Sequence, residues 1–502
     1  MAGKLEKGRG QVQELRRLVG SADTPPEQVD WPAVHSCLDL LDSLLLESKS
    51  SEKSKKLLNT PEPAKERKKG NPIGNGHGRN GAKDFGGAEK HEVKHENLNR
   101  GGPCPSCVGG KVYPTGSPGV IVRLYAQPLI TGDVYNLERL KCNCCSSIFT
   151  ARPPEGVGDE KYDETVPAAL AVSRFLAGVP SKRLEKFLAQ FNIPLPHSTQ
   201  WELLADASDA LGPIFEELQR QAANCGNIHF DDSSMKVLEL NRTLTERTGV
   251  HTTAVVADAP GKKIALFFTG EKHGGENAEK LLTKRLAGLP KPTLMTDALS
   301  RNHIADLEYI EANCLVHARR NFVQQLDKFP DSCKHLITEL GKVYANEAEA
   351  KRLGLSDDSR MSYHQNHSGP IMGSLHGWAK NIVDNELEEP NSVLGKALNY
   401  LLKHWDKLTR FLDVPGCPLD NNVSERAIKR MVLYRKNSLF YRNENGSRAG
   451  DLFMSLIHTC ELNGVPAYEY LVKVLRHSDH AALEPGSWLP WNYKSMLEPE
   501  TG

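Results

Sequence analysis

The hydrophobic pattern of the first half of the chain predicts helices in two stretches. In residues 11–48 the apolar positions alternate spacings of three and four, which predicts an amphipathic helix. This seam lasts about two heptads, so it fits pairing with a second copy and packing within one domain equally well. Residues 163–224 also have a helical period. We therefore predict an N-terminal helical or coiled-coil segment over 1–48 and a helical region over 160–225.

Part of the second stretch predicts two helices joined by a turn. Pro194 and Pro196 mark the turn, and Ser198 is a candidate N-cap for the helix that contains Trp201. Two helices around a short turn fit a helix-turn-helix DNA reader. The same pattern is also the commonest way to pack two helices, so both interpretations stay open.

After Gly226 the period changes to short β-rich runs, which include NIHF, HTTAVVAD, KKIALFFTG and PTLMTD. A helical pattern, ENAEKLLTKRLAGL, lies among them, so we predict an α/β domain around one sheet. Residues 330–415 are largely helical in pattern and contain no strand run. The expected fold class of the whole chain is multi-domain α+β, with a core domain over 226–460 and a C-terminal segment over 461–502.

Composition changes sharply in residues 49–100. Gly, Asn, Lys and Pro dominate there, and thirteen Lys or Arg face seven Asp or Glu. Such a stretch cannot bury enough apolar surface to fold, so it predicts a basic flexible linker. The linker acts as a tether, and its cations fit a non-specific hold on phosphates.

The whole chain of 502 residues has 63 Lys or Arg and 63 Asp or Glu, so its net charge does not indicate a nucleic-acid partner. Any such partner must be inferred from local patches. No apolar run approaches the ~20 residues of a membrane span, and the start MAGKLEKGRG does not resemble a secretory signal. We expect a cytoplasmic protein with no membrane partner. Eleven cysteines in such a chain favour thiols or metal ligands over disulfides.

Two cysteine pairs predict a small zinc-binding domain over residues 101–155. CPSC supplies Cys104 and Cys107, and CNCC supplies Cys142 and Cys145, with Cys144 as an alternative fourth ligand. Each Cys-x-x-Cys pair can present two thiolates to one tetrahedral Zn²⁺. Because so small a ribbon has little core, the metal would supply much of its folding free energy.

Three acidic residues are candidates for metal-dependent chemistry. Asp231 and Asp297 each end a predicted strand, and Glu425 lies in the first turns of a helix for which Asp420 or Asn421 is the candidate N-cap. Taken singly, such acids usually start turns or form surface ion pairs. The helix also carries a cluster of cations that suits a phosphate backbone: Arg426, Lys429, Arg430, Arg435, Lys436 and, just beyond it, Arg442.

Carboxylates that meet at one place repel each other and raise their pKa values unless a divalent cation lies between them. We therefore predict that Asp231 faces a metal site and that its strand fixes its position. Two Mg²⁺ or Mn²⁺ ions held by such acids support in-line displacement at a phosphodiester. Asp232 should point to the other face of the strand, and we assign it no chemistry.

Several segments, in this order, resemble the transposases of the insertion-sequence 66 (IS 66) group, which are bacterial DDE enzymes with an RNase H-like core. The resemblance runs from about Gly74 to Tyr493. The matching segments are CPSC with CNCC, IHFDDSSMKVL, LMTDALS, CLVHARRNF, DNNVSERAIKRMVLYRKNSLF with GSRAG, and SWLPWNY. The long glutamate segment is the most specific of these.

The resemblance implies that Asp231, Asp297 and Glu425 form the Mg²⁺-binding catalytic triad. It also implies that CLVHARRNF supplies a Cys-x-x-His signature, Cys314 and His317, near the active site. His317 and Arg426 would be supporting residues. The expected DNA-binding residues are Arg319, Arg320, Lys429, Arg430, Arg435 and Lys436. Residues 330–415 resemble the helical insertion of such enzymes.

By the same resemblance, the chain is a transposase that binds the terminal repeats of its element, cleaves DNA strands and joins them to target DNA. It would act as a homo-oligomer, with helper proteins of the same element, in the bacterial cytoplasm near the nucleoid. The alternatives are a catalytically silent DNA-binding relative and a nuclease without strand transfer. Asp232 and Ser233 replace the usual Glu and Thr, and Ala298 and Leu299 replace a small residue followed by an aromatic one.

Overall fold

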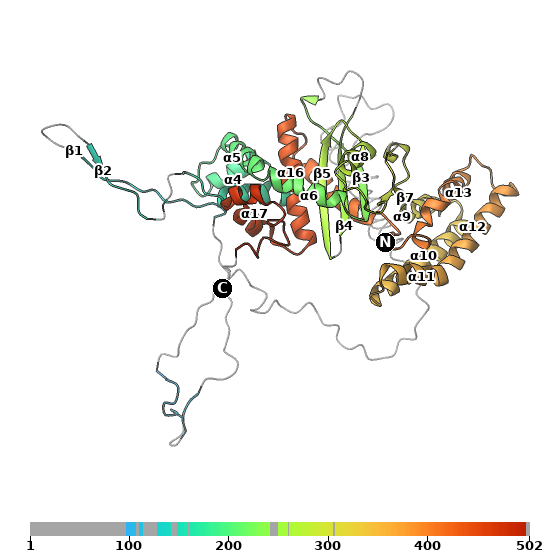
Figure 1. Cartoon of the computed structure of the whole chain (residues 1–502), viewed down its shortest axis with the longest axis horizontal. Coiled ribbons are helices and arrows are strands. Elements are labelled where there is room, and N and C mark those ends of the chain that lie inside the picture. Colours follow the sequence, from blue (N-terminus) through green and yellow to red (C-terminus); the bar gives the residue numbers. More distant parts are fainter. Residues whose placement is uncertain are drawn as a thin grey trace, which may run out of the picture. The chain divides into compact units, whose positions relative to one another are not determined.

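The fold is seen in a computed structural model (Figure 1). The chain forms two compact units, 1–125 and 126–502, and each is described by itself. The structure describes residues 97–106, 110–113, 128–141, 148–155, 157, 160–240, 249–259, 261–304 and 307–497. The predicted N-terminal helical segment and nearly all of the basic linker lie outside these residues, as do the predicted zinc ligands other than Cys104.

In the first unit, Cys104 lies in a short hairpin-like loop. Its backbone N–H donates to the carbonyl of Gly110 (2.8 Å), and the N–H of Val112 donates to the carbonyl of Gly102 (2.9 Å). In the second unit, strands β1 (Arg139–Lys141) and β2 (Ile148–Thr150) pair antiparallel.

Helices fill the stretch that precedes the sheet. They are α3 (Thr165–Ala171), which continues into the π-helical η3 (Val172–Leu176), α4 (Ser181–Ala189), α5 (His197–Ala210) and α6 (Gly212–Ala223). Their apolar faces join the main hydrophobic core, with Leu184 and Leu204 almost completely buried. None of the described helices is long and apolar enough to span a lipid bilayer.

The prediction that Ser198 caps α5 is wrong. The helix begins at His197, with Pro196 at the N-cap position, and Ser198 lies inside the first turn. The N–H of His197 instead donates to the carboxylate of Glu185 on α4 (3.1 Å). A carboxylate at a helix N-terminus is favourable because the helix dipole is positive there. The cap of α5 therefore comes from the neighbouring helix, which a local sequence pattern does not show.

The sheet has five strands in the order β5-β4-β3-β6-β7. The strand β3 pairs antiparallel with β4, and β4 with β5, whereas β3 pairs parallel with β6, and β6 with β7. The protein is thus a mixed α/β structure. The bounds of the strands are Asn227–Met235 for β3, Val250–Ala259 for β4, Lys262–Gly270 for β5, Thr293–Thr296 for β6 and Ile310–Asn313 for β7.

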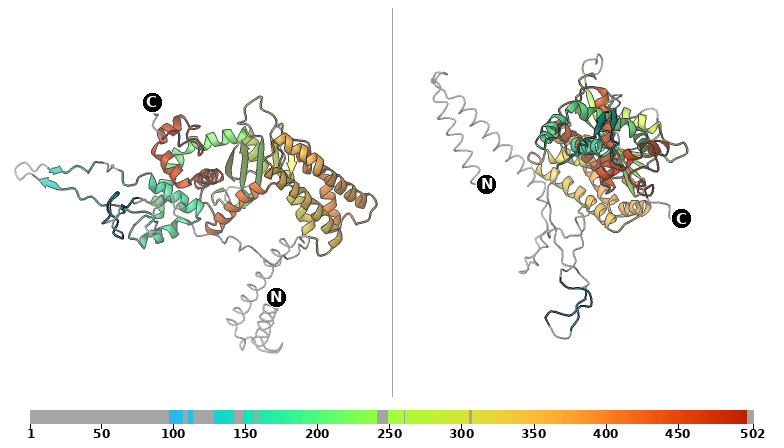
Figure 2. Two further views of the ribbon diagram at one scale, coloured as in Figure 1. Left: turned by 90° about the horizontal axis from the view of Figure 1, so that it is seen from below. Right: turned by 90° about the vertical axis from the view of Figure 1, so that its left-hand side faces the viewer.

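Helices cover both faces of this sheet (Figure 2), which explains why β4 and β5 are apolar over most of their length. The helix α15 (Asn422–Asn437) packs on β3 and β4 from one side, and α8 (Gly274–Leu282) and α6 pack on the other. A short 3-10 turn, η4 (Ser300–Asn302), follows β6 and contacts α8.

The helix α16 (Glu444–Leu462) lies along the edge strand β5 and bonds to its backbone. Four polar side chains, spaced four residues apart, accept these hydrogen bonds and form a polar stripe along the helix. The N–H groups of alternate β5 residues, Lys263, Ala265, Phe267 and Thr269, donate to the side chains of Asn463, Thr459, Ser455 and Asp451. The spacing works because four helical residues rise about 6 Å and two strand residues about 6.8 Å.

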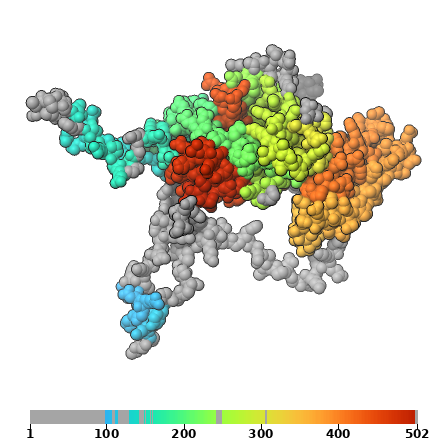
Figure 3. Space-filling view, in the orientation of Figure 1, coloured from blue at the N-terminus to red at the C-terminus, as the bar shows by residue number. Residues whose placement is uncertain are grey.

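Between β7 and α15 the structure contains helices only. They are α9 (Leu315–Val323), α10 (Pro330–Arg352), α11 (Asp357–His367), α12 (Gly369–Asp384), α13 (Val393–Lys403), α14 (Trp405–Leu408) and the 3-10 turn η5 (Arg410–Leu412). They surround a second hydrophobic core, to which the sheet contributes Met295 and Ala312. The space-filling view (Figure 3) shows these helices, in yellow-orange to orange, as a compact lobe beside the sheet region.

The chain ends with α17 (Ala467–Arg476), α18 (Ser478–Leu483) and an irregular segment. In that segment Trp488, Leu489 and Tyr493 are buried in the main core. The hydroxyl of Tyr470 donates to the carbonyl of Trp488 (2.9 Å) and fixes the segment against α17. The sequence SWLPWNY is therefore part of the core of the second unit.

Candidate active site

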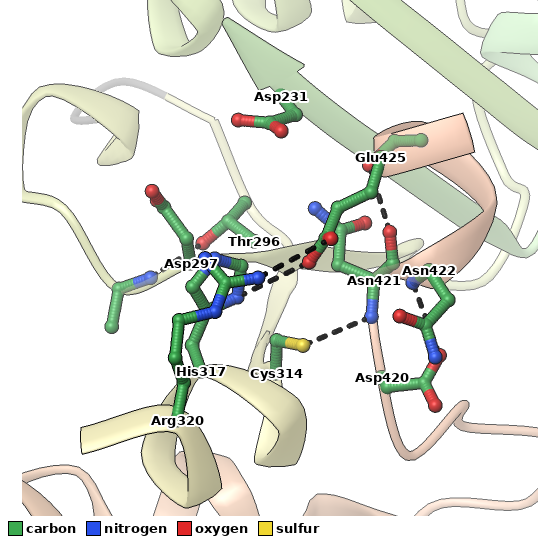
Figure 4. A network of polar contacts seen from close by, with 12 residues as sticks. Asp231, Thr296, Asp297, Cys314, His317, Arg320, Asp420, Asn421, Asn422 and Glu425 are labelled. Atoms are coloured by element: carbon green, nitrogen blue, oxygen red, sulfur yellow. Dashed lines mark hydrogen bonds and ion pairs between the residues drawn. The ribbon is translucent and has the colours of Figure 1, made fainter. Parts of the chain in front are cut away.

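Asp231 lies in the middle of the central strand β3, opposite Ala254 of β4, and not at a strand end as predicted. Burial and the charges of Asp297, Glu425 and Asp232, against a hydrogen bond from the N–H of Asp232, together raise the pKa of its carboxyl group to about 6. The effect of Asp297 and Glu425 shows that the three predicted acids share one electrostatic environment. Figure 4 shows the three acids in one region, reached from three different elements.

Asp297 follows the last residue of β6, the strand that pairs parallel with β3. Its carboxylate accepts hydrogen bonds from the side chain of Asn302 (2.6 Å) and from the N–H of Leu299 (3.3 Å). The hydroxyl of Tyr400 donates to its backbone carbonyl (3.2 Å). Ala298 has a φ of 65°, in the left-handed region, which costs a non-glycine residue about 1 kcal/mol. The sharp turn after Asp297 is thus held by its surroundings.

Glu425 lies in the first turn of α15 and faces α9. One carboxylate oxygen, Oε2, is 3.5 Å from Nη2 of Arg320. The other, Oε1, is 3.7 Å from Nδ1 of His317. Burial and the positive charge of Arg320 lower the pKa of His317, against the opposite influence of Glu425 and Asp297.

The segment 416–421, which we call the strap, leads into α15 and is bonded on several sides. The carbonyl of Gly416 accepts from the side chain of Asn227 at the start of β3 (3.1 Å). The carbonyl of Leu419 accepts from the N–H of Leu315 (3.1 Å). Arg360 of the helical insertion donates to the carbonyl of Cys417 (3.1 Å). The sheet, α9 and the insertion therefore all help to place Glu425.

Asn421, the last residue of the strap, is completely buried and joins α15 to β3. It occupies the N-cap position of α15, as predicted, but its side chain makes no cap hydrogen bond. Its amide instead donates to the carbonyl of Phe230 (2.9 Å), and its Oδ1 lies 3.2 Å from Nδ1 of His229. The carboxylate of Asp420 accepts from the N–H of Asn422 (3.1 Å). The sequence signalled a cap here and gave no sign of the link to β3.

Asp232 points to the opposite face of β3 from Asp231, and its side chain is only 2% exposed. It accepts hydrogen bonds from the hydroxyl of Thr253 (2.7 Å) and from the N–H of Gly274 at the start of α8 (2.8 Å). A Cβ on Gly274 would lie 2.9 Å from the ring of Phe230, so only glycine fits this close approach. Asp232 thus anchors α8 behind the candidate site.

The predicted DNA-binding cations fall into two groups. Arg430 forms an ion pair with Glu461 of α16, and Arg435 donates to Ser233 and Ser234 of β3, so both have protein partners. Arg319 is half-buried on α9. The exposed cations of the set are Arg320, Lys429 and Lys436, and Arg426, predicted as a supporting residue, is also exposed. These four cations give the last turn of α9 and the outer face of α15 a positive charge.

The donor sets around Glu425 fit two kinds of cation. The triad offers only carboxylate oxygens, which Mg²⁺ prefers. In the described part of the chain, the one group of three ligand-type residues with ligand atoms within 4.8 Å of one another is Cys314, His317 and Glu425. The ligand oxygens of Asp231, Asp297 and Glu425 therefore do not all lie within 4.8 Å of one another.

One family model matches the chain. The family model described as "Transposase IS66 family" matches residues 161–449, more than half of the chain, and this range contains Asp231, Asp297 and Glu425. Three relatives come from Sinorhizobium fredii (strain NBRC 101917 / NGR234), and each is named as an uncharacterized protein. The protein y4jD is 27% identical to this chain, and the match covers 71% of this chain and 71% of y4jD. The protein y4hP is 24% identical, and the match covers 71% of this chain and 67% of y4hP. The protein y4qI is 24% identical, and the match covers 66% of this chain and 62% of y4qI. This chain belongs to the transposase IS66 family.

Proposed function

We propose that this chain is the DNA transposase of an insertion sequence, which cleaves DNA strands at the ends of its element and joins them to target DNA. The observation that carries the proposal is the meeting of Asp231, Asp297 and Glu425, which are far apart in the sequence, in one electrostatic environment. Family membership supports the same activity. The order and mixed directions of the five strands support the RNase H-like core that the resemblance implies.

In this proposal the three carboxylates hold Mg²⁺ or Mn²⁺, which supplies an activated nucleophile and neutralises charge on the leaving oxygen. Asp231 and Asp297 are held by neighbouring parallel strands, so their separation is fixed by the sheet. Glu425 comes from the first turn of α15, the helix that packs on β3 and β4. His317 supports Glu425, since its Nδ1 lies 3.7 Å from Oε1 of that carboxylate.

We propose that DNA lies against the exposed cations Arg320, Arg426, Lys429 and Lys436. Arg320 of α9 lies beside Glu425 (Figure 4), and the other three cations lie on α15, the helix that carries Glu425, so a phosphate backbone held by them would pass near the acids. Such contacts release counterions, and binding should weaken steeply with added salt. The proposed partners are element ends, target DNA, a second copy of the chain and helper proteins of the same element.

The decisive experiment incubates the full chain with labelled element ends and Mg²⁺ or Mn²⁺. We expect cleavage and joining by the unmodified protein. We expect Asp231→Asn, Asp297→Asn and Glu425→Gln each to reduce cleavage by at least 10³-fold while DNA affinity stays within a few-fold.

Glu444→Gln is the matched control, because Glu444 is also in the first turn of a helix but pairs with Arg448 at the surface. It should keep full activity. Cleavage that survives in any triad variant would remove that residue from the site. Cleavage without joining by the unmodified protein would identify a nuclease instead of a transposase.

A further inference from the structure

We propose that Cys314, His317 and Glu425 form a second cation site, which takes a thiophilic divalent ion such as Zn²⁺ and shares Glu425 with the catalytic acids. Each residue offers one ligand atom, and the three atoms all lie within 4.8 Å of one another. Two ligands of one tetrahedral zinc lie roughly 3.3–3.8 Å apart, so side-chain shifts of about 1 Å suffice to close the site.

The backbone already places two of the ligands together. Cys314 is the N-cap residue of α9, directly after β7, and His317 is the third residue of the helix. Residues at these positions of a first turn lie on the same side of the helix. The sulfur of Cys314 also accepts the N–H of Asn421 (3.2 Å), and Asn421 in turn precedes α15, which carries Glu425. The Cys-x-x-His spacing and the strap thus bring sulfur, nitrogen and oxygen to one point.

Two buried atoms of this group lack a hydrogen-bond partner. They are Nδ1 of His317 and Oε1 of Glu425, which face each other at 3.7 Å. A buried polar atom without a partner costs about 1–3 kcal/mol, so such a pair indicates a missing bridging group. Arg320 pairs with the other oxygen of Glu425, and its side chain is 47% exposed. A cation between the two atoms would satisfy both.

The mixed donor set selects the kind of cation. Thiolate and imidazole ligands suit Zn²⁺, whereas Mg²⁺ prefers oxygen alone. On binding, the S–H bond of Cys314 breaks, a sulfur–metal bond forms and the proton passes to solvent, so no oxidant or reductant is needed. Because the site uses Glu425, an ion held there would withdraw this carboxylate from the catalytic acids. The predicted consequence, inhibition by zinc, rests on the proposed function, but the binding itself does not.

The test titrates the full chain with Co²⁺ after dialysis against a chelator. Cobalt replaces zinc and absorbs strongly when a thiolate binds it. Cysteines elsewhere in the chain also bind cobalt, so matched variants are compared. We expect the unmodified protein and Cys417→Ser, which changes a buried cysteine of the strap, to bind one more equivalent than Cys314→Ser and His317→Gln.

Equal cobalt stoichiometry and equal thiolate absorption in all four proteins would overturn the proposal. Circular dichroism checks that each variant is folded. If Cys314→Ser is not folded, the comparison of His317→Gln with the unmodified protein is the test. The readout needs neither DNA nor cleavage. A protein that shows the cobalt difference but cleaves no DNA would refute the proposed function and leave this site standing.

A second measurement tests the sharing of Glu425. Bound Mn²⁺, followed by electron paramagnetic resonance, should be displaced in the unmodified protein by about one equivalent of Zn²⁺ beyond the zinc that the predicted zinc-binding domain takes up. In Cys314→Ser at least tenfold more zinc should be needed. Displacement at the same zinc concentration in both proteins would show that the two cations do not share a ligand.

Discussion

A single amide, that of Asn421, connects two of the three acids of the candidate site. Its Nδ2 bonds to the backbone of Phe230, next to Asp231, and its own backbone leads directly into the helix of Glu425. The amide is completely buried, so water cannot replace its hydrogen bonds. Asn421 therefore acts as a positioning residue for Asp231 and Glu425.

We predict that Asn421→Ala lowers metal-dependent cleavage at least tenfold, because the distance between β3 and α15 is no longer fixed. It should also reduce the free energy of unfolding by about 1–3 kcal/mol, since two buried partners lose a hydrogen bond. DNA affinity should be unchanged. The measurements are cleavage rate against Mn²⁺ concentration and urea unfolding.

Asn422→Ala is the control for this prediction. Asn422 is the next residue and is only partly buried, and its hydrogen bond to the carboxylate of Asp420 is donated by its backbone N–H. That variant should keep its cleavage rate. An equal loss of cleavage rate in Asn421→Ala and Asn422→Ala would mean that any substitution at the start of α15 lowers cleavage, and would contradict the specific role of Asn421.

The sequence identified individual residues better than their partners. Asp231 and Asp297 could be named because each ends an apolar run, and Glu425 because it begins a helix rich in cations. The sequence did not show the roles of Asn421, Asn302 and Tyr400, because these roles depend on atoms that are distant in the sequence. An Asn before a helix has the pattern of an N-cap, and only the packed structure shows that its side chain is used elsewhere.

At the scale of elements, the helical insertion is tied to the strap through Glu347 and Arg360. Two nitrogens of Arg360 donate to the two oxygens of Glu347 (2.8 and 2.9 Å), and a third donates to the strap at Cys417. His364 lies 2.9 Å from the same carboxylate. Burial alone would raise the pKa of Glu347, but the hydrogen bonds from His364 and Arg360 outweigh it and lower the pKa to about 2.

This network predicts a pH dependence of stability. The pKa of Glu347 is lower in the folded chain than its ordinary value of 4.5, so the stabilisation is fully present above pH 4.5 and is lost as pH falls toward 2. A shift of this size corresponds to about 3 kcal/mol. Urea unfolding, followed by tryptophan fluorescence, should show that Glu347→Gln is destabilised at pH 6 and that the difference shrinks toward pH 3.

Glu349→Gln is the control for the pH prediction, because Glu349 lies on the same helix and pairs with Arg352 at the surface. Its stability should stay close to that of the unmodified protein at every pH. A constant difference between Glu347→Gln and the unmodified protein from pH 6 to pH 3 would contradict the role assigned to Glu347.

The elements themselves were largely predictable and their arrangement was not. The β-rich runs after Gly226 form β3 to β6, and the region 330–415 contains the expected helices. The order of the strands depends on long-range pairing, such as that of β3 with β6, which leaves no local signal. The stripe of α16 was also missed, because Asp451, Ser455, Thr459 and Asn463 look like ordinary polar positions until β5 lies beside them.

At the scale of the whole molecule, the zinc-binding domain stays a prediction, since only Cys104 of its ligands is among the described residues. We predict about one tightly bound zinc per chain, which the double variant Cys104→Ser with Cys107→Ser loses. Metal analysis after dialysis against a weak chelator measures it. Cys225→Ser, at a buried cysteine of the main core, should keep the metal. Absence of zinc from the unmodified protein would reject the domain.

The stripe on α16 has a consequence for assembly. An uncovered edge strand can recruit a strand from a neighbouring molecule, which leads to sheet extension or aggregation. In this protein the edge-facing N–H groups of β5 already donate to side chains of α16, so this edge of the sheet is closed to a strand from a second molecule. We therefore expect that any contact between copies of this chain does not extend the sheet at β5.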